Sequence, residues 1–163
     1  MRRLIILLLA LGLAACGFQL RGSYTLPWDT LYLGMGENTP MYAQLKRSIE
    51  ASTKTRIVTD AKEAQASLMI VSDQQAKSIL SLNAKGRVRE FQLTRTFVYR
   101  IQDAKGKELL PASPIVLMRE MTFDDEQIFA KEAEEGMIYL EMQNDLVQQL
   151  LRRLAASSRA TKG

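Results

Sequence analysis

The sequence predicts an α+β fold, a two-layer sandwich in which two helices pack on one face of an about four-stranded, mostly antiparallel sheet. Three consecutive segments between residues 66 and 123 have the residue patterns of strands and are joined by turn-rich stretches. Segments before and after them carry apolar residues at helical spacing. The 163 residues suffice for one domain with a hydrophobic core, and no internal repeat or second domain is indicated.

The first fifteen residues predict a signal peptide that is removed from the mature protein. Arg2 and Arg3 precede an uncharged, mostly aliphatic stretch over residues 4–15. This stretch is too short to span a bilayer, which takes about 20 apolar residues, and its length and flanks are typical of a secretory signal. Positions 13–16 read Leu-Ala-Ala-Cys, and small residues before the cut suit the pocket of a signal peptidase.

Cys16 is the only cysteine of the chain, and its context resembles a bacterial lipobox. The resemblance implies that the Cys16 thiol receives a diacylglyceryl group, that the signal is cut before it, and that the new amine is acylated. Three acyl chains would hold the protein on a membrane, because each buried CH₂ adds about 0.8 kcal/mol of membrane affinity. In Gram-negative lipoproteins an aspartate after the cysteine favours the inner membrane, so Gly17 indicates the outer membrane. The alternative is an ordinary signal peptide with an incidental thiol.

The composition excludes several functional classes. Without histidine there is no imidazole base, no His-ligated metal and no Ser-His-Asp triad. The cysteine is expected to be a thioether, which leaves no thiol chemistry and no disulfide. Removal of Arg2 and Arg3 reduces 22 basic residues to 20 against 18 acidic ones, a net charge of +2, which does not indicate nucleic-acid binding. We therefore expect no metal and no cofactor, and among enzymatic mechanisms the composition leaves open only catalysis by carboxylates.

One acidic cluster keeps a hydrolase open as a third interpretation. Asp124, Asp125 and Glu126 are consecutive, and a glycan hydrolase needs two carboxylates about 5 to 9.5 Å apart across a cleft. The sequence offers no convincing pair, and the cluster is expected to be a solvated turn that caps a helix.

Residues 16–27 are expected to form the lipidated N-terminus and a tether, because they contain polar residues and glycine without a clear period. A single domain is predicted over residues 28–156. It begins with a short strand over about residues 28–35, where two leucines alternate with a tyrosine.

A helix is predicted over residues 40–52. Thr39 can cap its first turn, and Pro40 suits the first helical position because its missing N–H has no partner there. An extended piece over residues 56–59 and a local turn or half-helix over residues 60–65 follow. The apolar face of the helix is expected to comprise Met41, Tyr42, Leu45 and Ile49.

Three strands in a row, joined by tight turns, predict an antiparallel meander. The first, over residues 66–82, starts with an apolar run that is typical of a strand covered on both faces. A hairpin loop over residues 83–86 leads to the second strand over residues 87–101. Another hairpin loop over residues 103–107 and a proline-bounded return lead to the third, over residues 115–123. The face of the second strand toward the helices is expected to contain Phe91, Leu93, Phe97, Tyr99 and Ile101.

The period becomes helical over about residues 126–156. Residues 157–163 are polar and basic and are expected to form a disordered tail. The apolar stripe of this last helix is predicted to comprise Ala133, Met137, Ile138, Leu140, Leu146, Val147, Leu150, Leu151 and Leu154.

The chain resembles the lipopolysaccharide-assembly lipoprotein family LptE. The resemblance is carried by residues Cys16 to Gly22, Ala66 to Ile70, Glu90 to Leu93 and Phe129 to Glu132 with Glu134, Glu135 and Met137. The order of elements extends it over the whole mature chain. It implies a non-enzymatic outer-membrane lipoprotein, anchored on the periplasmic side, that sits as a plug inside the β-barrel LptD. It also implies that the pair places lipopolysaccharide in the outer leaflet and that the lipoprotein itself binds lipopolysaccharide.

Basic residues compatible with that ligand gather at one predicted end of the sheet. Lipid A carries two phosphates, which favour paired cationic side chains. Lys85, Arg87 and Arg89 surround the first hairpin turn, and Lys131 lies in the first turns of the last helix. In a meander the third strand ends at the sheet end that holds this turn, so Lys131 is expected near Lys85 and Arg87. The alternative is that all four are ordinary solvated charges.

Two other arginines stand out because they fall in the apolar phase of their strands. Arg95 and Arg119 indicate either a polar end of the sheet or a contact with the barrel. A competing hypothesis for the whole protein is a different envelope lipoprotein, a lipid-transport or scaffold component that docks on an inner-membrane transporter.

Overall fold

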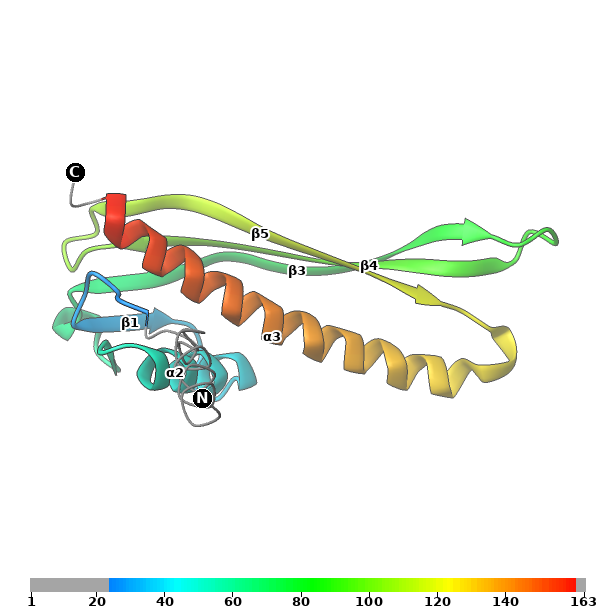
Figure 1. Cartoon of the computed structure of the whole chain (residues 1–163), viewed down its shortest axis with the longest axis horizontal. Helices are drawn as coiled ribbons and strands as arrows, with labels where there is room; N and C mark the ends of the chain where they lie inside the picture. The colour runs from blue at the N-terminus through cyan, green and yellow to red at the C-terminus, as the bar shows by residue number, and fades with distance from the viewer. Residues whose placement is uncertain (1–23, 161–163) are drawn as a thin grey trace, which may run out of the picture.

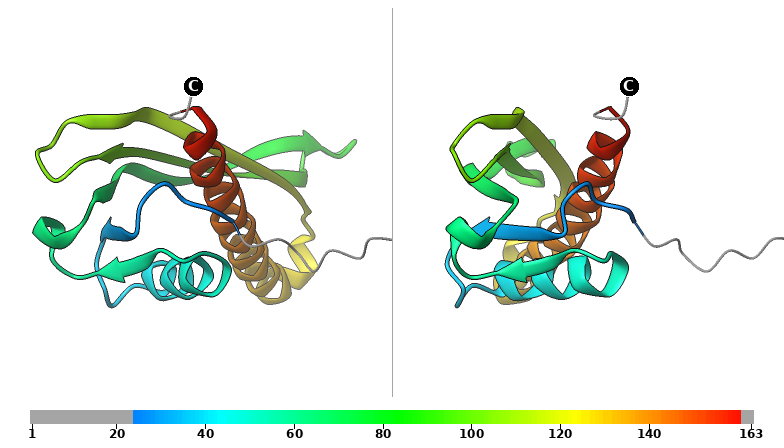
Figure 2. Two further views of the ribbon diagram at one scale, coloured as in Figure 1. Left: turned by 60° about the vertical axis from the view of Figure 1, so that its left-hand side comes forward. Right: turned by 90° about the vertical axis from the view of Figure 1, so that its left-hand side faces the viewer.

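Five strands form one mixed sheet, and two helices pack on it in the computed structural model of the chain, which describes residues 24–160 (Figures 1 and 2). The order in the sheet is β2-β1-β3-β4-β5. The elements are β1 (Thr30–Gly34), α2 (Pro40–Ser52), β2 (Arg56–Val58), β3 (Ala66–Leu82), β4 (Val88–Gln102), β5 (Glu108–Thr122) and α3 (Ile128–Ala160). The predicted α+β class, with two helices packed on the sheet, is confirmed.

The strand count is one higher than predicted because β2 joins the sheet. Its three residues pair in parallel with β1, with Thr30 opposite Arg56 and Tyr32 opposite Val58. Strand β1 in turn pairs in parallel with the first residues of β3, from Leu31 opposite Ala66. The long pairings, β3 with β4 and β4 with β5, are antiparallel as the meander predicts.

Strand β5 begins at Glu108, earlier than the predicted residue 115, and so contains the two prolines of the predicted return. Pro111 and Pro114 fit here because β5 is an edge strand, where an absent N–H removes no ladder hydrogen bond if it faces outward. Strand β3 is paired on both sides only as far as Met69, and from there to Leu82 it has β4 alone as a neighbour. The β3–β4 register shifts between Ile70 and Ser72 and again between Ile79 and Leu82.

Helix α2 starts as its sequence predicts. The Thr39 hydroxyl oxygen accepts a hydrogen bond from the backbone N–H of Tyr42 at 3.2 Å, and Pro40 is the first helical residue. All four residues of its predicted apolar face are buried. The cap therefore fixes the rotation that presents this face to the sheet.

The hydrophobic core occupies one half of the elongated molecule, which we call the proximal half. Buried residues stop at Leu68 on β3, begin at Leu93 on β4, and begin at Met142 on α3. The other half, the distal arm, consists of the β3–β4 hairpin, the end of β5 and the N-terminal half of α3 (Figure 1). No described residue of β3 beyond Leu68 is buried.

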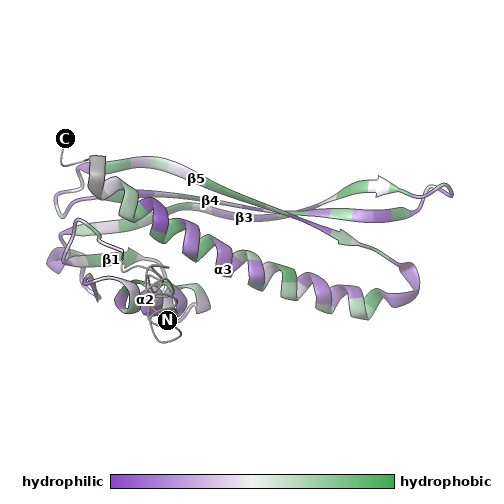
Figure 3. Ribbon diagram, viewed as in Figure 1, coloured by the Kyte–Doolittle hydropathy of each residue, from purple (hydrophilic) through white to green (hydrophobic). Residues whose placement is uncertain are grey.

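Helix α3 differs from the prediction in its packing and in its end. Met137 and Leu140 are 59% and 62% exposed and Ala133 is exposed, so the predicted stripe is wrong at these three positions. Ile138, which lies between them in sequence, packs against the core, and the stripe residues from Leu146 onward are buried, so this part of the helix faces the sheet with Ile138 and not with Met137 or Leu140. Hydrophobic positions also recur along the N-terminal half of α3 in Figure 3. The helix continues to Ala160, four residues beyond the predicted end at 156 and into the expected tail.

The N-terminal boundary of the domain also lies earlier than expected. Leu26 is buried in the core, and the Tyr24 N–H donates to the Ser52 carbonyl at 2.8 Å. Residues 24–27, which were expected to belong to the tether, therefore pack on the domain. The predicted signal peptide, Cys16 and residues 161–163 lie outside the described residues.

Candidate functional site

The turn between β3 and β4 holds Lys85 and Arg87 at the tip of the distal arm, and Arg89 follows as the second residue of β4 (Figure 1). The Asn83 side-chain oxygen accepts from the backbone N–H groups of Lys85 at 2.9 Å and Arg87 at 3.0 Å. Gly86 has a φ of 75°, the left-handed conformation that its sequence predicts. The turn is therefore tightly built, and it projects the Lys85 and Arg87 side chains into solvent.

The three cations of the tip differ in their partners. Arg87 Nη1 lies 3.3 Å from Asp125 Oδ2, with both side chains about half exposed. Arg89 Nη2 lies 2.9 Å from Glu90 Oε2. Lys85 takes part in none of the ion pairs formed among residues 24–160. Lys85 is therefore the cation of this turn that is most available to an anion.

Glu90 stays ionised beside Arg89. Hydrogen bonds from the Ser81 hydroxyl and then from the Arg89 guanidinium hold the pKa of the Glu90 carboxyl below its usual value of 4.5. The Arg89 side chain is thereby held by a carboxylate and also donates to the Ser81 hydroxyl at 3.3 Å. Its positive charge is partly compensated within the arm.

Lys131 lies at the same end of the sheet, as the meander predicts, but it is held by its neighbours. Its Nζ donates to Glu134 Oε2 at 2.8 Å and to Thr122 Oγ1 at 3.0 Å. The Lys131 side chain is only 16% exposed. The structure thus brings Arg87 and Lys131 to the end of β5 and gives each a carboxylate partner, rather than a cluster of free cations.

The consecutive acidic residues form a turn, in agreement with the interpretation of this cluster as a cap. The Asp124 carboxylate accepts from the Glu126 N–H at 3.0 Å at the start of a short 3₁₀ turn over Asp125–Gln127. Asp125 is the partner of Arg87. Among the described residues, no group of histidine, cysteine and carboxylate side chains is arranged to hold a metal ion.

Arg95 and Arg119, the two arginines that fall in the apolar phase of their strands, both form ion pairs within the domain. The Arg95 side chain is 5% exposed and binds Asp73 through two hydrogen bonds, Nε to Oδ1 at 2.9 Å and Nη2 to Oδ2 at 2.7 Å. Its Nη2 also lies 3.6 Å from Met41 Sδ on α2. Arg119 on β5 pairs with Asp145 on α3. These side chains join the sheet to the helices.

Sequence reasoning missed a cluster around Lys77 that joins the distal arm to α3. Lys77 Nζ lies 4.3 Å from the centroid of the Phe91 ring and 2.6 Å from Glu135 Oε2. The Phe91 and Phe123 rings meet edge to face at 5.1 Å. The sequence has no signal for this cluster, because it is the β3–β4 register that places Lys77 opposite Leu93 on the face toward the helix. Cation–π and ion-pair contacts thus replace a hydrophobic core in this half.

Apolar side chains point outward on several sides of the distal arm. Val116 and Met118 alternate with the buried Ile115 and Leu117 and so lie on the sheet face away from α3. Others lie on β3 near the tip and on the N-terminal half of α3. The exposed large apolar residues of the arm are Ile79, Leu80, Leu82, Ile128, Phe129, Met137 and Leu140, and Val116 and Met118 adjoin it on the proximal part of β5. Phe129 is 87% exposed.

No helix among the described residues is long and apolar enough to cross a membrane.

Comparisons with known proteins agree with this architecture. The family model described as LptE, Lipopolysaccharide-assembly, matches residues 28–154. The LPS-assembly lipoprotein LptE of Pectobacterium atrosepticum is 30% identical over 93% of this chain and 85% of its own. That of Photorhabdus laumondii is 27% identical over 98% of this chain and 90% of its own.

Solved structures show the same fold. The solution structure of an uncharacterized lipoprotein B from Nitrosomonas europaea has a TM-score of 0.76 and 39% identity, and the match covers 88% of this chain and 94% of that one. The crystal structure of the rare lipoprotein B from Shewanella oneidensis has a TM-score of 0.71 at 19% identity, covering 82% and 99%.

Proposed function

The chain belongs to the LptE lipopolysaccharide-assembly family, and from this premise we propose that it plugs the outer-membrane β-barrel LptD as a lipid-anchored subunit. In this role it assists the insertion of lipopolysaccharide into the outer membrane and has no enzymatic activity. The lipid attached at Cys16 holds it on the periplasmic side of that membrane.

The proposal that the chain plugs a barrel rests on the outward apolar residues of the distal arm. A domain that docks through one face exposes one apolar patch, whereas this arm exposes apolar side chains near the tip of β3 and on α3, and the adjoining part of β5 exposes more on the outer sheet face. A partner that surrounds the arm would cover all three together. The inside of a β-barrel has that geometry.

The barrel contact is tested on the outward residues of α3. Met137→Gln with Leu140→Gln removes apolar surface without touching the core, so the fold should be retained while less barrel co-purifies in mild detergent. Glu132→Gln with Glu141→Gln, at exposed positions of the same helix, is the matched control and should retain the barrel. Mass spectrometry of the co-purified protein identifies the partner. An inner-membrane transporter in place of a barrel would contradict the plug and support the envelope-scaffold hypothesis.

The lipid anchor has its own test. Mass spectrometry of the mature wild-type protein should show a triacylated N-terminus at Cys16, and Cys16→Ser should leave an unprocessed or unlipidated chain that is poorly retained on the outer membrane. A mature chain with a free Cys16 thiol would contradict the anchor.

Within this role, we assign the lipid A phosphates to the tip of the distal arm, at Lys85, Arg87, Arg89 and Lys131. Lys85 makes the first contact because it has no carboxylate partner among residues 24–160. Arg87 can exchange Asp125 for a phosphate, since their contact is 3.3 Å long and exposed. Each charge-assisted hydrogen bond to a phosphate contributes about 1.5 to 3 kcal/mol.

The second hairpin supplies a matched control for this site. Residues 103–107 read Asp-Ala-Lys-Gly-Lys and residues 83–87 read Asn-Ala-Lys-Gly-Arg, and both turns have the same hydrogen bonds. Replacing Lys85, Arg87 and Lys131 with Ser should weaken lipopolysaccharide binding, whereas replacing Lys105 and Lys107 with Ser should not. Affinity and barrel co-purification are measured on both variants. Equal affinity of the two folded variants would reject the site, and loss of the barrel as well would assign these residues to docking.

A further inference from the structure

A surface hollow lined by two arginines lies near the C-terminal end of α3, at the end of the molecule opposite the tip of the distal arm (Figure 1). We call it the arginine hollow. Its volume is ≈ 240 Å³, and the spacing of its lining residues by three, four and seven positions places them on one face of the helix. The lining residues are Gln149, Arg152, Arg153 and Ala156.

Arg153 is held in position from beneath the hollow. Its Nη1 donates to the Pro114 carbonyl oxygen on β5 at 2.5 Å. Burial raises the pKa of the Tyr99 hydroxyl above its usual value of 10.0, and the charge and hydrogen bond of Arg153 partly oppose this shift. The buried Leu151 and Leu154 fix the same turns of α3 on the core. This guanidinium is therefore already ordered, so less side-chain entropy is lost when it binds an anion.

The second guanidinium of the hollow is available to a ligand. Arg152 is exposed and belongs to none of the ion pairs formed within residues 24–160. The sequence has no acidic residue after Asp145 on α3, and none between Glu108 and Glu120 on β5. The Gln149 amide can add a further donor. An anion in the arginine hollow thus meets two positive charges and no carboxylate from these two segments.

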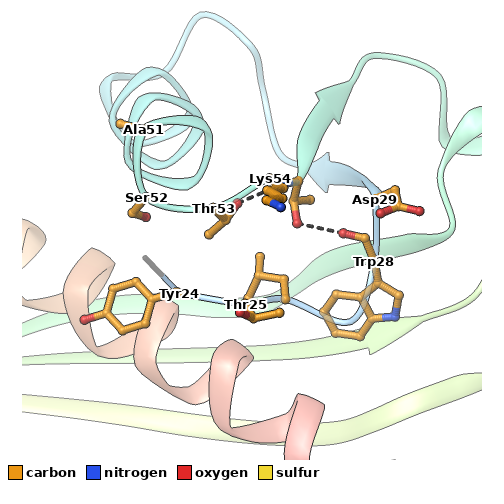
Figure 4. A pocket seen from close by; sticks show the side chains of 10 residues that line it. Tyr24, Thr25, Trp28, Asp29, Ala51, Ser52, Thr53 and Lys54 are labelled. Carbon is orange, nitrogen blue, oxygen red and sulfur yellow. Dashed lines mark hydrogen bonds between the residues drawn. The ribbon is translucent and has the colours of Figure 1, made fainter. Parts of the chain in front are cut away.

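A larger hollow in the proximal half has different chemistry (Figure 4). It has a volume of ≈ 320 Å³ and lies between the segment that begins at Tyr24 and the end of α2. One cation, Lys54, and one carboxylate, Asp29, are among its lining residues. Because the two charges offset each other, this hollow does not favour an anion as the arginine hollow does.

We propose that the arginine hollow binds a phosphate dianion, either free phosphate or the phosphate monoester of a larger ligand. A guanidinium binds phosphate oxygens with two parallel hydrogen bonds, and two guanidinium groups offset the two charges of a dianion. A phosphodiester carries one charge and binds more weakly. The phosphates of lipid A are monoesters, so lipopolysaccharide is one source of such a group. The site needs neither the barrel nor the tip and goes beyond the proposed function.

The site is tested by NMR titration of the mature full-length protein in a neutral detergent. The probes are glucose 1-phosphate, inorganic phosphate and glycerophosphoglycerol, which is a monoanionic diester. We expect the first two to shift the backbone amides of residues 149–156 and the diester to bind several-fold more weakly. Tighter binding of glucose 1-phosphate than of inorganic phosphate would identify a monoester as the ligand, and equal binding would identify free phosphate. A diester that binds as tightly as both would overturn the proposal.

Arg47 supplies a matched control on α2. It is exposed and, like Arg152, belongs to no ion pair of the described residues. Arg152→Gln should weaken the binding of glucose 1-phosphate about tenfold, because a charge-assisted contact is lost. Arg47→Gln removes the same charge from another helix and should change the affinity less than about twofold. Equal affinities of the two folded variants would contradict the site.

The pH dependence tests the charge of the ligand. The second pKa of a phosphate monoester is about 6, so the dianion predominates at pH 7.5 and the monoanion at pH 5.5. The chain has no histidine, so no side chain has an ordinary pKa between 5 and 8. Arginine stays charged throughout this range, and Tyr99 behind Arg153 stays neutral because its pKa is raised.

Glucose 1-phosphate should therefore bind several-fold more weakly at pH 5.5 than at pH 7.5, whereas the affinity of the diester should not change. Equal affinity of the monoester at both values would overturn the assignment to a dianion. Shifts confined to the turn around Lys85 would overturn the arginine hollow and leave the proposed function intact, because the barrel and the tip are tested on other residues.

Discussion

Single residues determine the geometry of the two hairpin turns. Asn83 and Asp103 each accept two backbone hydrogen bonds through one side-chain oxygen, and Gly86 and Gly106 have φ values of 75° and 79°. A side chain at a positive φ is strained because its Cβ approaches the following carbonyl oxygen. The two turns are thus equivalent in backbone, and the difference between the ends of the sheet arises from what surrounds them.

Two glycine substitutions should have opposite effects on stability. Gly86→Ala places a Cβ at a φ of 75° and should lower the free energy of unfolding by about 1 to 2 kcal/mol. Gly136→Ala lies within α3, where an added Cβ meets nothing within 4 Å, and should raise it by about 0.5 to 1 kcal/mol. Urea unfolding of both variants measures the two values. Destabilisation by Gly136→Ala would mean that the helix is not continuous at this position.

The buried Arg95 shows how one residue joins two layers. Its guanidinium binds Asp73 with two hydrogen bonds and reaches Met41 on α2. No buried side-chain nitrogen or oxygen among the described residues lacks a hydrogen-bond partner. The cost of burying this charge is therefore offset by its carboxylate, and removal of that carboxylate alone leaves the charge uncompensated.

Asp73→Ala should destabilise the fold by about 3 kcal/mol, because Arg95 then remains buried without a partner. The double variant Asp73→Ala with Arg95→Met should recover part of the loss, since an apolar side chain of similar length replaces the charge. Thermal unfolding of the two single variants and the double variant completes the cycle. Additive losses would show that the pair is not coupled.

At the scale of elements, residue patterns predicted the element boundaries that depend on residues close together in the chain. An apolar run located β3 and alternation located β4, each to within one residue, and the Thr39 cap located the start of α2. Strand β2 was not assigned to the sheet because its three residues are too short to show alternation. Its pairing depends on β1, which is more than twenty residues away in the chain.

The spacing of residues in the sequence could not predict how α3 packs or which carboxylates pair with the cations. Helical spacing detects an apolar stripe, but it does not show which side of the helix faces the sheet: Met137 and Leu140 are exposed, whereas Ile138 packs against the core. The turn that carries Lys85 was predicted from its own residues. The partner of Arg87 was not, because Asp125 is brought to it by the return of β5, 38 positions later.

The assignment of which β4 residues face the helices can be tested by substituting two adjacent residues of the strand. Phe97 is fully buried on the helix side, and Thr96 lies on the opposite face. Phe97→Ala should therefore cost about 3 to 5 kcal/mol, whereas Thr96→Ala should cost less than about 1 kcal/mol. Melting temperatures compare the two variants. A melting point of Phe97→Ala equal to that of the wild type would contradict the assigned face.

At the scale of the molecule, the two halves are held together differently. The proximal half has a continuous hydrophobic core, whereas the distal arm relies on the Lys77 cluster and on ion pairs with α3. Partly exposed ion pairs contribute little, typically up to about 1 kcal/mol each. The arm should therefore open locally at a lower free energy than the core.

Amide hydrogen exchange along β4 tests this difference within one strand. Strand β4 is paired with β3 on one side and β5 on the other throughout residues 90–92 and residues 95–99. Residues 90–92 should exchange faster than residues 95–99, which should exchange only on global unfolding. Equal rates, measured by NMR in the absence of partners, would show that the arm and the core unfold as one unit.

The register shifts of β3 have a consequence for how copies of the chain meet. From Ile70 to Leu82 this strand has a neighbour on one side only, and a straight unpaired edge of that length is a template for joining other chains and for fibril growth. The shifts after Ile70 and after Ile79 bend the strand and break the even row of N–H and C=O groups. The charged side chains of Asp73 and Lys77 lie between these bends. The edge therefore offers a second copy no continuous run for pairing, which protects the chain against aggregation while its arm is uncovered.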